Sequence, residues 1–219
     1  MVREFAPGIE VPPKPPPPPP TFLQRHTVTI GLALLGGVFA VLGAFIEEMR
    51  GGGGIFLAVV LAPVIEEVLK PIGVIWVLEK RPHYLLSRVH VVVLCVVGAL
   101  VFATLENLLY IHVHWPLQQA TAEQVEISGR GPGPEPGAAE TAQRASFIRF
   151  RFTACTALHV LASAIVGLGL GRQLIRMRRE KSDFDLERSL SFLIAAIVLH
   201  GTYNATVFIL ERAGWRPWS

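Results

Sequence analysis

The sequence predicts an all-α membrane protein, a polytopic bundle of about five transmembrane helices. Of its 219 residues, 51% are hydrophobic and only 17% are charged, whereas soluble domains carry about 25% charged residues. The mean hydropathy is +0.46. The apolar residues also gather into runs long enough to cross a bilayer, which takes roughly 20 residues of helix. Composition and run length together indicate an integral membrane protein.

A proline-rich tail precedes the apolar runs. Residues 1–24 contain the sequence PPKPPPPPP, which can only form extended polyproline II and offers too little apolar surface to fold alone. We expect this tail to be disordered, as a spacer or as a docking segment, and the composition favours the spacer. We expect residues 25–212 to form the transmembrane helical domain, with a flexible loop at about 115–146 that is rich in Gly, Pro and Glu.

Five apolar runs make up the predicted bundle. The first, 27–46, is longer than the core of a signal peptide, so we expect it to be retained as a transmembrane helix. A short turn with Glu47, Glu48, Arg50 and four glycines follows it. The other four runs are 55–78, 89–112, 150–171 and 190–210.

The distribution of Lys and Arg predicts the orientation. With the N-terminus inside, twelve of these residues lie in the tail and connections on the inner side and seven in those on the outer side. Positive charge is in excess on the cytoplasmic side of membrane proteins, so we expect a cytoplasmic N-terminus in a multi-pass protein of the plasma membrane. The basic residues form no stripe with interleaved aromatics, so the lipid bilayer is the expected partner and a nucleic acid is not.

Four charged residues lie in the middle of the apolar runs, where each costs about 2.5–3.5 kcal/mol to insert. Glu66, Glu67 and Lys70 are in the second run and Glu106 is in the third. Glu66 and Lys70 share a helix face, whereas Glu67 lies about 100° further round, so the two carboxylates cannot play identical roles. Pro71 cannot donate a hydrogen bond to the carbonyl of Glu67, which predicts a kink at this depth.

The later runs add candidates at helical spacing. They are Phe102, Glu106, Asn107 and Tyr110 in the third run, His159 in the fourth, and His200 and Asn204 in the fifth. At a rise of 1.5 Å per residue, five of the candidates fall in one layer of the membrane about 8 Å thick. They are Glu66, Glu106, His159, His200 and Asn204. Each residue alone also has a structural explanation, as an ion pair or an interhelical hydrogen bond. Their common depth on four helices favours a functional site inside the bundle.

Other reactive residues are assigned no chemistry. The two cysteines lie in apolar runs and behave as small hydrophobes, while a second acidic pair and four histidines lie at or near the membrane interfaces. These residues are Cys95, Cys155, Glu47, Glu48, His83, His90, His112 and His114.

Four motifs follow one another on separate runs between 55 and 210. They are Glu66-Glu67-Val68-Leu69-Lys70, then Phe102-Ala103-Thr104-Leu105-Glu106-Asn107 with Tyr110, then His159, then His200-Gly201-Thr202-Tyr203-Asn204. This series resembles the PrsW family of intramembrane metalloproteases, relatives of the type II CAAX prenyl proteases. The first motif alone is common, whereas the ordered set is specific.

The resemblance implies an intramembrane endopeptidase that cleaves membrane-associated proteins or peptides. It implies that Glu66 activates water, that Glu67 supports it or orients Lys70, and that Asn204 steadies the developing oxyanion. The implied catalytic residues are Glu66, Glu67, Glu106, His159, His200 and Asn204, and the implied supporting residues are Lys70, Phe102, Asn107, Tyr110 and Tyr203.

The residues leave the cofactor open. His159, His200 and Glu106 could form a site for a divalent metal such as zinc, or the same groups could serve a metal-free glutamate protease. No run carries the zinc motif HExxH or the hydrolase motif GxSxG, and Ser163 is not favoured as a nucleophile.

Two other functions also fit buried Glu, His and Lys. One is a proton- or ion-coupled transporter, which five runs without paired repeats disfavour, and the other is an inactive scaffold.

Overall fold

The computed structural model describes residues 18–51, 54–116 and 137–215, and these residues form a helical bundle without strands. Four helical stretches are long and apolar enough to cross a membrane. They are Phe22–Ile46, Arg88–His114, Glu140–Glu180 and Leu186–Arg212. With a broken helix between the first two, they confirm the predicted all-α transmembrane bundle.

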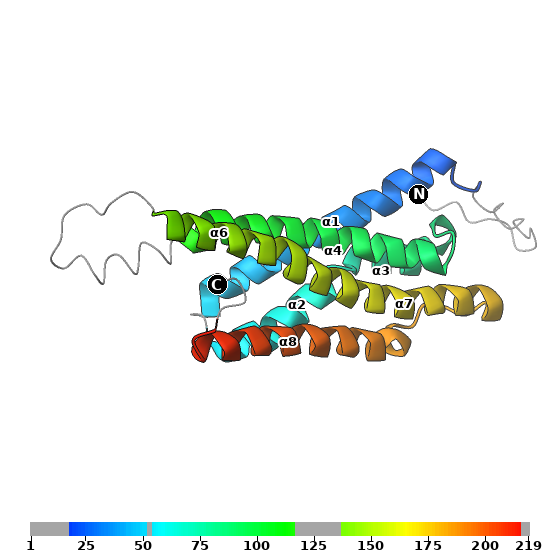
Figure 1. Cartoon of the computed structure of the whole chain (residues 1–219). Helices are drawn as coiled ribbons and strands as arrows, with labels where there is room; N and C mark the ends of the chain where they lie inside the picture. Colours follow the sequence, from blue (N-terminus) through cyan, green and yellow to red (C-terminus); the bar gives the residue numbers. More distant parts are fainter. Residues whose placement is uncertain (1–17, 52–53, 117–136, 216–219) are drawn as a thin grey trace, which may run out of the picture.

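Consecutive segments of the chain run up and down the bundle, so the start of α1 and the end of α8 lie at opposite ends (Figure 1). The long α-helices are α1 (Phe22–Gly51), α4 (Arg88–Leu109), α6 (Ala138–Phe150), α7 (Thr156–Glu180) and α8 (Leu190–Arg212). Three π-helical turns are η1 (Leu57–Leu61), η3 (Tyr110–His114) and η4 (Arg151–Cys155), and two 3₁₀ turns are η2 (Pro82–Tyr84) and η5 (Leu186–Ser189). Because η4 joins α6 to α7 without a break, these two helices form one long rod.

The second predicted span is a broken helix. It consists of η1 followed by α2 (Ala62–Leu69) and α3 (Ile72–Lys80). The break lies at Pro71, whose nitrogen carries no hydrogen for a bond to the preceding turn. The structure thus contains the predicted kink, and the acidic residues and lysine of this span lie in the turn just before it.

Two predicted connections are shorter than expected. α1 continues through Gly51, so residues 47–51 are helical, since Glu, Met and Arg are good helix formers. α6 begins at Ala138, because the sequence AAETAQRA favours a helix and Glu140 suits its first turn. The remainder of the predicted loop, 117–136, and most of the tail, 1–17, lie outside the described residues.

α1 packs closely against the broken helix at two glycines. A Cβ atom at Gly73 would overlap the carbonyl oxygen of Leu32, and one at Gly36 would overlap the carbonyl oxygen of Lys70. Only glycine allows helix backbones to approach this closely. α1 therefore covers one side of the kink, and the polar side chains of α2 face α7 and α8 instead.

Candidate active site

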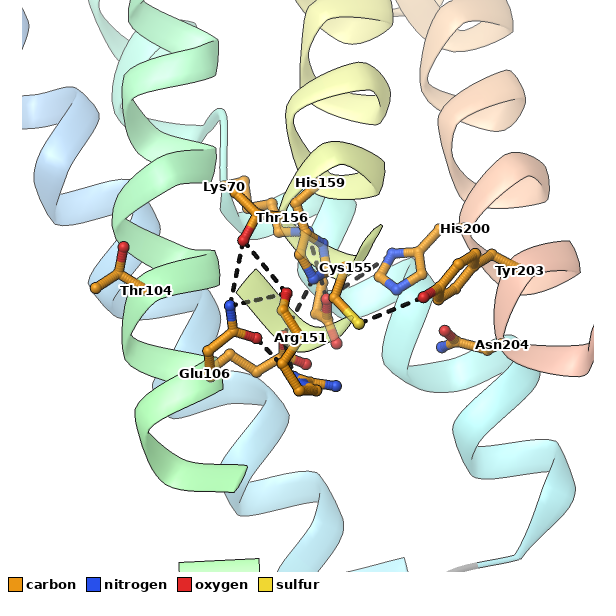
Figure 2. Close-up of polar contacts among 12 residues, drawn as sticks. Lys70, Thr104, Glu106, Arg151, Cys155, Thr156, His159, His200, Tyr203 and Asn204 are labelled. Carbon is orange, nitrogen blue, oxygen red and sulfur yellow. Dashed lines mark hydrogen bonds and ion pairs between the residues drawn. The ribbon is translucent and has the colours of Figure 1, made fainter. Parts of the chain in front are cut away.

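Lys70 lies at the centre of a buried polar cluster (Figure 2). Its ammonium nitrogen is 2.8 Å from Glu67 Oε1, 3.3 Å from Glu66 Oε2 and 2.9 Å from His159 Nδ1. The same nitrogen lies 4.1 Å from the centroid of the Phe102 ring. The side chain is 0% exposed, and a buried ammonium is tolerated only with partners of this kind.

His159 joins this cluster to α4. Its Nε2 lies 3.1 Å from Glu106 Oε2, while its Nδ1 faces Lys70. A carboxylate accepts and an ammonium donates, so the hydrogen-bond network assigns the proton to Nε2 and leaves Nδ1 as an acceptor. The Phe102 ring meets the imidazole edge-on at a centroid distance of 4.9 Å, which restricts the orientation of the His159 ring.

His200 completes the cluster from α8. Its Nδ1 lies 2.9 Å from Glu67 Oε1 and 3.8 Å from Glu66 Oε2. Glu67 is fully buried between His200 and Lys70, whereas Glu66 lines a cavity. The two neighbouring carboxylates have different surroundings, as their positions around the helix predict.

The cavity beside the cluster has a volume of about 290 Å³. Glu66, Glu106, His159 and His200 all line it, so the structure brings together groups that the sequence places at one depth. Much of the remaining wall is aromatic, with Tyr110, Trp115, Phe147, Phe150, Tyr203 and Phe208. Glu211 also lines the cavity, which therefore extends from the cluster toward the end of α8.

Asn204 and Tyr203 lie in the cavity wall, set apart from the Lys70 cluster (Figure 2). The side-chain amide of Asn204 donates to the carbonyl of Ala58 in η1 at 2.8 Å. The Tyr203 hydroxyl lies 3.4 Å from the sulfur of Cys155. Both predicted residues thus border the site, and Asn204 also ties α8 to the helix that carries the two glutamates.

Arg151 belongs to the site, although its position at the edge of an apolar run suggested a loop charge. Its guanidinium lies 2.8 Å from Glu106 Oε2, and its Nε donates to Asn107 Oδ1 at 3.0 Å. The four-residue spacing of Arg151, Cys155 and His159 is the signal that could have revealed it, because such residues share one helix face.

The three π-helical turns border the cavity. η1 contributes Ala58, η3 contributes Tyr110 and His114, and η4 contributes Arg151 and Cys155. π-helical turns are rare and often occur at functional sites. Both His114 and Cys155, to which the sequence assigned no chemistry, therefore lie in the wall of the candidate active site.

Four residues of the cluster fit a metal ion. One ligand atom from each of Glu66, Glu67, His159 and His200 lies within 4.8 Å of the others. The Oε2 atom of Glu67 is buried and has no hydrogen-bond partner among the described residues. Imidazoles with carboxylates are the ligands of catalytic zinc sites, so the donor types suit a divalent metal. The Lys70 ammonium contacts three of the four residues and would have to move aside for the ion.

The structure places the three predicted ligands, His159, His200 and Glu106, in different surroundings. Glu106 lies on the far side of His159, at Nε2, where the Arg151 guanidinium also holds its carboxylate. Glu66 and Glu67 are the carboxylates that lie in one group with both histidines. Glu106 instead has the position of the carboxylate that orients a metal-binding histidine through its second ring nitrogen.

These features define the class of the protein: an integral membrane helical bundle with a buried, metal-compatible polar site. The chain belongs to the PrsW family of intramembrane metalloproteases, whose family model matches residues 22–216. Membership confirms the resemblance carried by the four motifs and supports a protease acting on membrane proteins. No curated protein and no solved structure matches the chain.

The cavity predicts different reactivity for the two cysteines. Cys155 lines the cavity beside Tyr203, whereas Cys95 is packed in the hydrophobic core. We expect a small water-soluble thiol reagent to modify Cys155 in the folded, detergent-solubilised protein and to leave Cys95 unmodified, as measured by mass spectrometry. Cys155→Ser is the control and should abolish labelling. If Cys155 stayed as unlabelled as Cys95, the reagent would not reach the cavity wall, which would contradict an open cavity.

Proposed function

We propose that this protein hydrolyses peptide bonds in membrane-associated protein substrates, with Glu66 activating the attacking water. The observation that carries the proposal is the position of Glu66 in the cavity wall, beside His159 and His200. A general base must lie within hydrogen-bond reach of the proton it removes. In this site, Glu66 can reach a water in the cavity.

Glu67 has a different part in this proposal. Its Oε1 atom accepts hydrogen bonds from both Lys70 and His200, and its side chain is 0% exposed. We infer that Glu67 orients these two side chains and leaves Glu66 to act on water. The division agrees with the weaker contact of Glu66 to Lys70, at 3.3 Å rather than 2.8 Å.

His159, His200 and Glu67, whose Oε2 has no hydrogen-bond partner among the described residues, are the residues that would hold a divalent metal such as zinc, which leaves Glu66 to act on water. When bound, such an ion polarises a carbonyl oxygen and makes a bound water more acidic. Each histidine already has a carboxylate at one ring nitrogen: Glu106 at His159 and Glu67 at His200. These contacts would fix the ring orientations needed for ligation.

Asn204 is the proposed donor to the oxyanion that forms on the substrate carbonyl. It lies one helical turn after His200 and lines the same cavity. One N–H of its amide serves the carbonyl of Ala58, and the amide carries a second N–H. A fixed donor in a site of low dielectric constant stabilises developing negative charge.

The proposed orientation keeps the N-terminus in the cytoplasm of a cell with this protein in its plasma membrane. Because Arg151 belongs to the site, the bias of Lys and Arg between inner and outer segments becomes twelve to six. The cavity extends toward the end of α8, which is the outer end in this orientation. Substrates would then enter from the outer half of the bilayer.

The direct test is cleavage by the purified protein in lipid vesicles, using a library of fluorogenic transmembrane peptides. We expect the wild type to cleave a subset of the library and His200→Ala to cleave none. His83→Ala is the matched control, because His83 is exposed at the end of the bundle, and it should retain full activity. A chelator followed by metal add-back then decides whether the protein uses a metal.

Other results would support other functions. A folded wild type that cleaves no member of a broad library would contradict the protease proposal. A proton flux across the same vesicles, abolished by Glu66→Ala, would indicate a transporter instead. If the wild type shows neither cleavage nor proton flux, the result would favour an inactive scaffold.

A further inference from the structure

Arg151 is a largely buried arginine within a membrane-spanning stretch. Its side chain is only 11% exposed, although an arginine near a membrane interface usually extends its charged end into water. Here the guanidinium instead turns inward and lies 3.8 Å above the centroid of the Tyr110 ring. Such a residue is costly to insert unless its charge is compensated, so its partners indicate what it does.

Three residues near the end of α4 contact the side chain of Arg151. Besides stacking on Tyr110, it forms an ion pair with Glu106 at 2.8 Å and donates to Asn107 Oδ1 at 3.0 Å. Asn107 returns a hydrogen bond from Nδ2 to the backbone carbonyl of Arg151 at 3.2 Å, and it bonds Thr156 at the same distance. The fully buried Asn107 therefore fixes both the backbone and the side chain of the arginine.

The contact with Glu106 connects Arg151 to the reactive cluster. Oε2 of Glu106 is the atom that faces both the guanidinium and His159 Nε2 (Figure 2). With Nε2 held by Glu106, Nδ1 of His159 faces Lys70 and the neighbouring carboxylates. The arginine is thus two contacts away from the atoms that the proposed reaction uses.

We propose that Arg151 is a positioning residue that holds Glu106 against His159 and so fixes the tautomer and orientation of that histidine. The inference rests on the proposed hydrolytic function but adds a residue outside its catalytic set. Arg151 compensates the charge of Glu106, which leaves Lys70 to the two glutamates of α2. Without the arginine, Glu106 would compete for Lys70, and His159 would lose its fixed partner.

Arg151→Gln is expected to lower kcat for peptide cleavage by about 10–100-fold, the effect typical of residues that orient an active-site histidine. KM should stay within about twofold, because the arginine does not act through substrate binding. Arg151→Lys, which keeps the charge but not the bond from Nε, should recover part of the loss. Arg149→Gln is the matched control, since Arg149 is exposed two residues earlier, and it should behave as wild type.

The double variant Arg151→Gln with Glu106→Gln shows whether Arg151 acts on catalysis through Glu106 or independently of it. If Arg151 acts through Glu106, adding Arg151→Gln to Glu106→Gln changes kcat by no more than about twofold. If the two losses in kcat multiply in the double variant, or if KM rises at constant kcat, the proposal is overturned in favour of direct contact between Arg151 and the substrate. Should Arg151→Gln fail to fold, Arg151→Lys enters the same cycle.

A spectroscopic measurement separates this inference from the proposed function. In ¹⁵N-histidine-labelled protein, with His159 assigned by a His159→Gln variant, we expect the Nε2–H tautomer in the wild type. Arg151→Gln and Glu106→Gln should both disturb that signal, and Arg149→Gln should not. An undisturbed His159 signal in Arg151→Gln would overturn the positioning role even if the wild type cleaves peptides. A wild type that cleaves nothing would count against the proposed function alone, because the spectra still decide the role of Arg151.

Discussion

Replacing Glu66 with glutamine is expected to lower kcat for peptide cleavage by about 10²–10⁴-fold, the range for loss of a general base, with little change in KM. Glutamine keeps the size of the side chain and an oxygen that can accept a hydrogen bond from Lys70. It cannot take a proton from water. Steady-state cleavage of one defined peptide in lipid vesicles measures the effect, and thermal unfolding in detergent establishes that the variant is folded.

Two further glutamine variants make this result specific. Glu79→Gln removes an exposed carboxylate on α3 that pairs with Lys80 at the surface, and its rate should equal that of the wild type. Glu67→Gln should lower the stability, since one Glu67 oxygen is bonded to both Lys70 and His200. If Glu67→Gln were as inactive as expected for Glu66→Gln, yet as stable as the wild type, the two carboxylates would have exchanged roles.

The helical repeat explains how much of the site could be predicted from sequence. Spacing along a helix fixes which residues share a face, and distance from the helix end fixes depth. These two rules predicted that His200 and Glu66 lie at the same depth, and both line one cavity. The missing N–H of Pro71 predicted the kink. The extensions of α1 and α6 escaped prediction because they are polar, and hydrophobic periodicity does not extend into them.

Contacts between helices could not be predicted from the same rules. The sequence placed Arg151 with the charges of the long loop, because arginines beside an apolar run usually lie at the membrane interface. Its inward direction depends on Glu106 and Asn107, which lie on another helix and more than forty residues away in sequence. Likewise, the sequence placed Glu106 at the depth of both histidines, and the packing of α4 puts its carboxylate at Nε2 of His159. Helix rotation and rotamer choice are properties of the packed bundle.

Replacing Lys70 with methionine is expected to lower the free energy of unfolding by about 3–5 kcal/mol, the cost of removing one partner from a buried ion pair. Methionine retains the unbranched apolar chain and packs adaptably beside Phe102. The loss therefore reports the ammonium, which is bonded to Glu66, Glu67 and His159. Denaturant titration in mixed micelles measures it, with intrinsic fluorescence as the signal.

Lys80→Met is the matched control for this result. Lys80 pairs with Glu79 at the surface, where its side chain is 57% exposed, so its loss should change the stability by only about 0–1 kcal/mol. The double variant Lys70→Met with Glu67→Gln should regain part of the lost stability, because it removes one of the two carboxylates left without a cation. If the double variant is less stable than Lys70→Met alone, the charge of Glu67 is balanced by His200, and Lys70 serves mainly Glu66. Because the ammonium touches both carboxylates, we expect the recovery, and with it a single lysine that balances both glutamates.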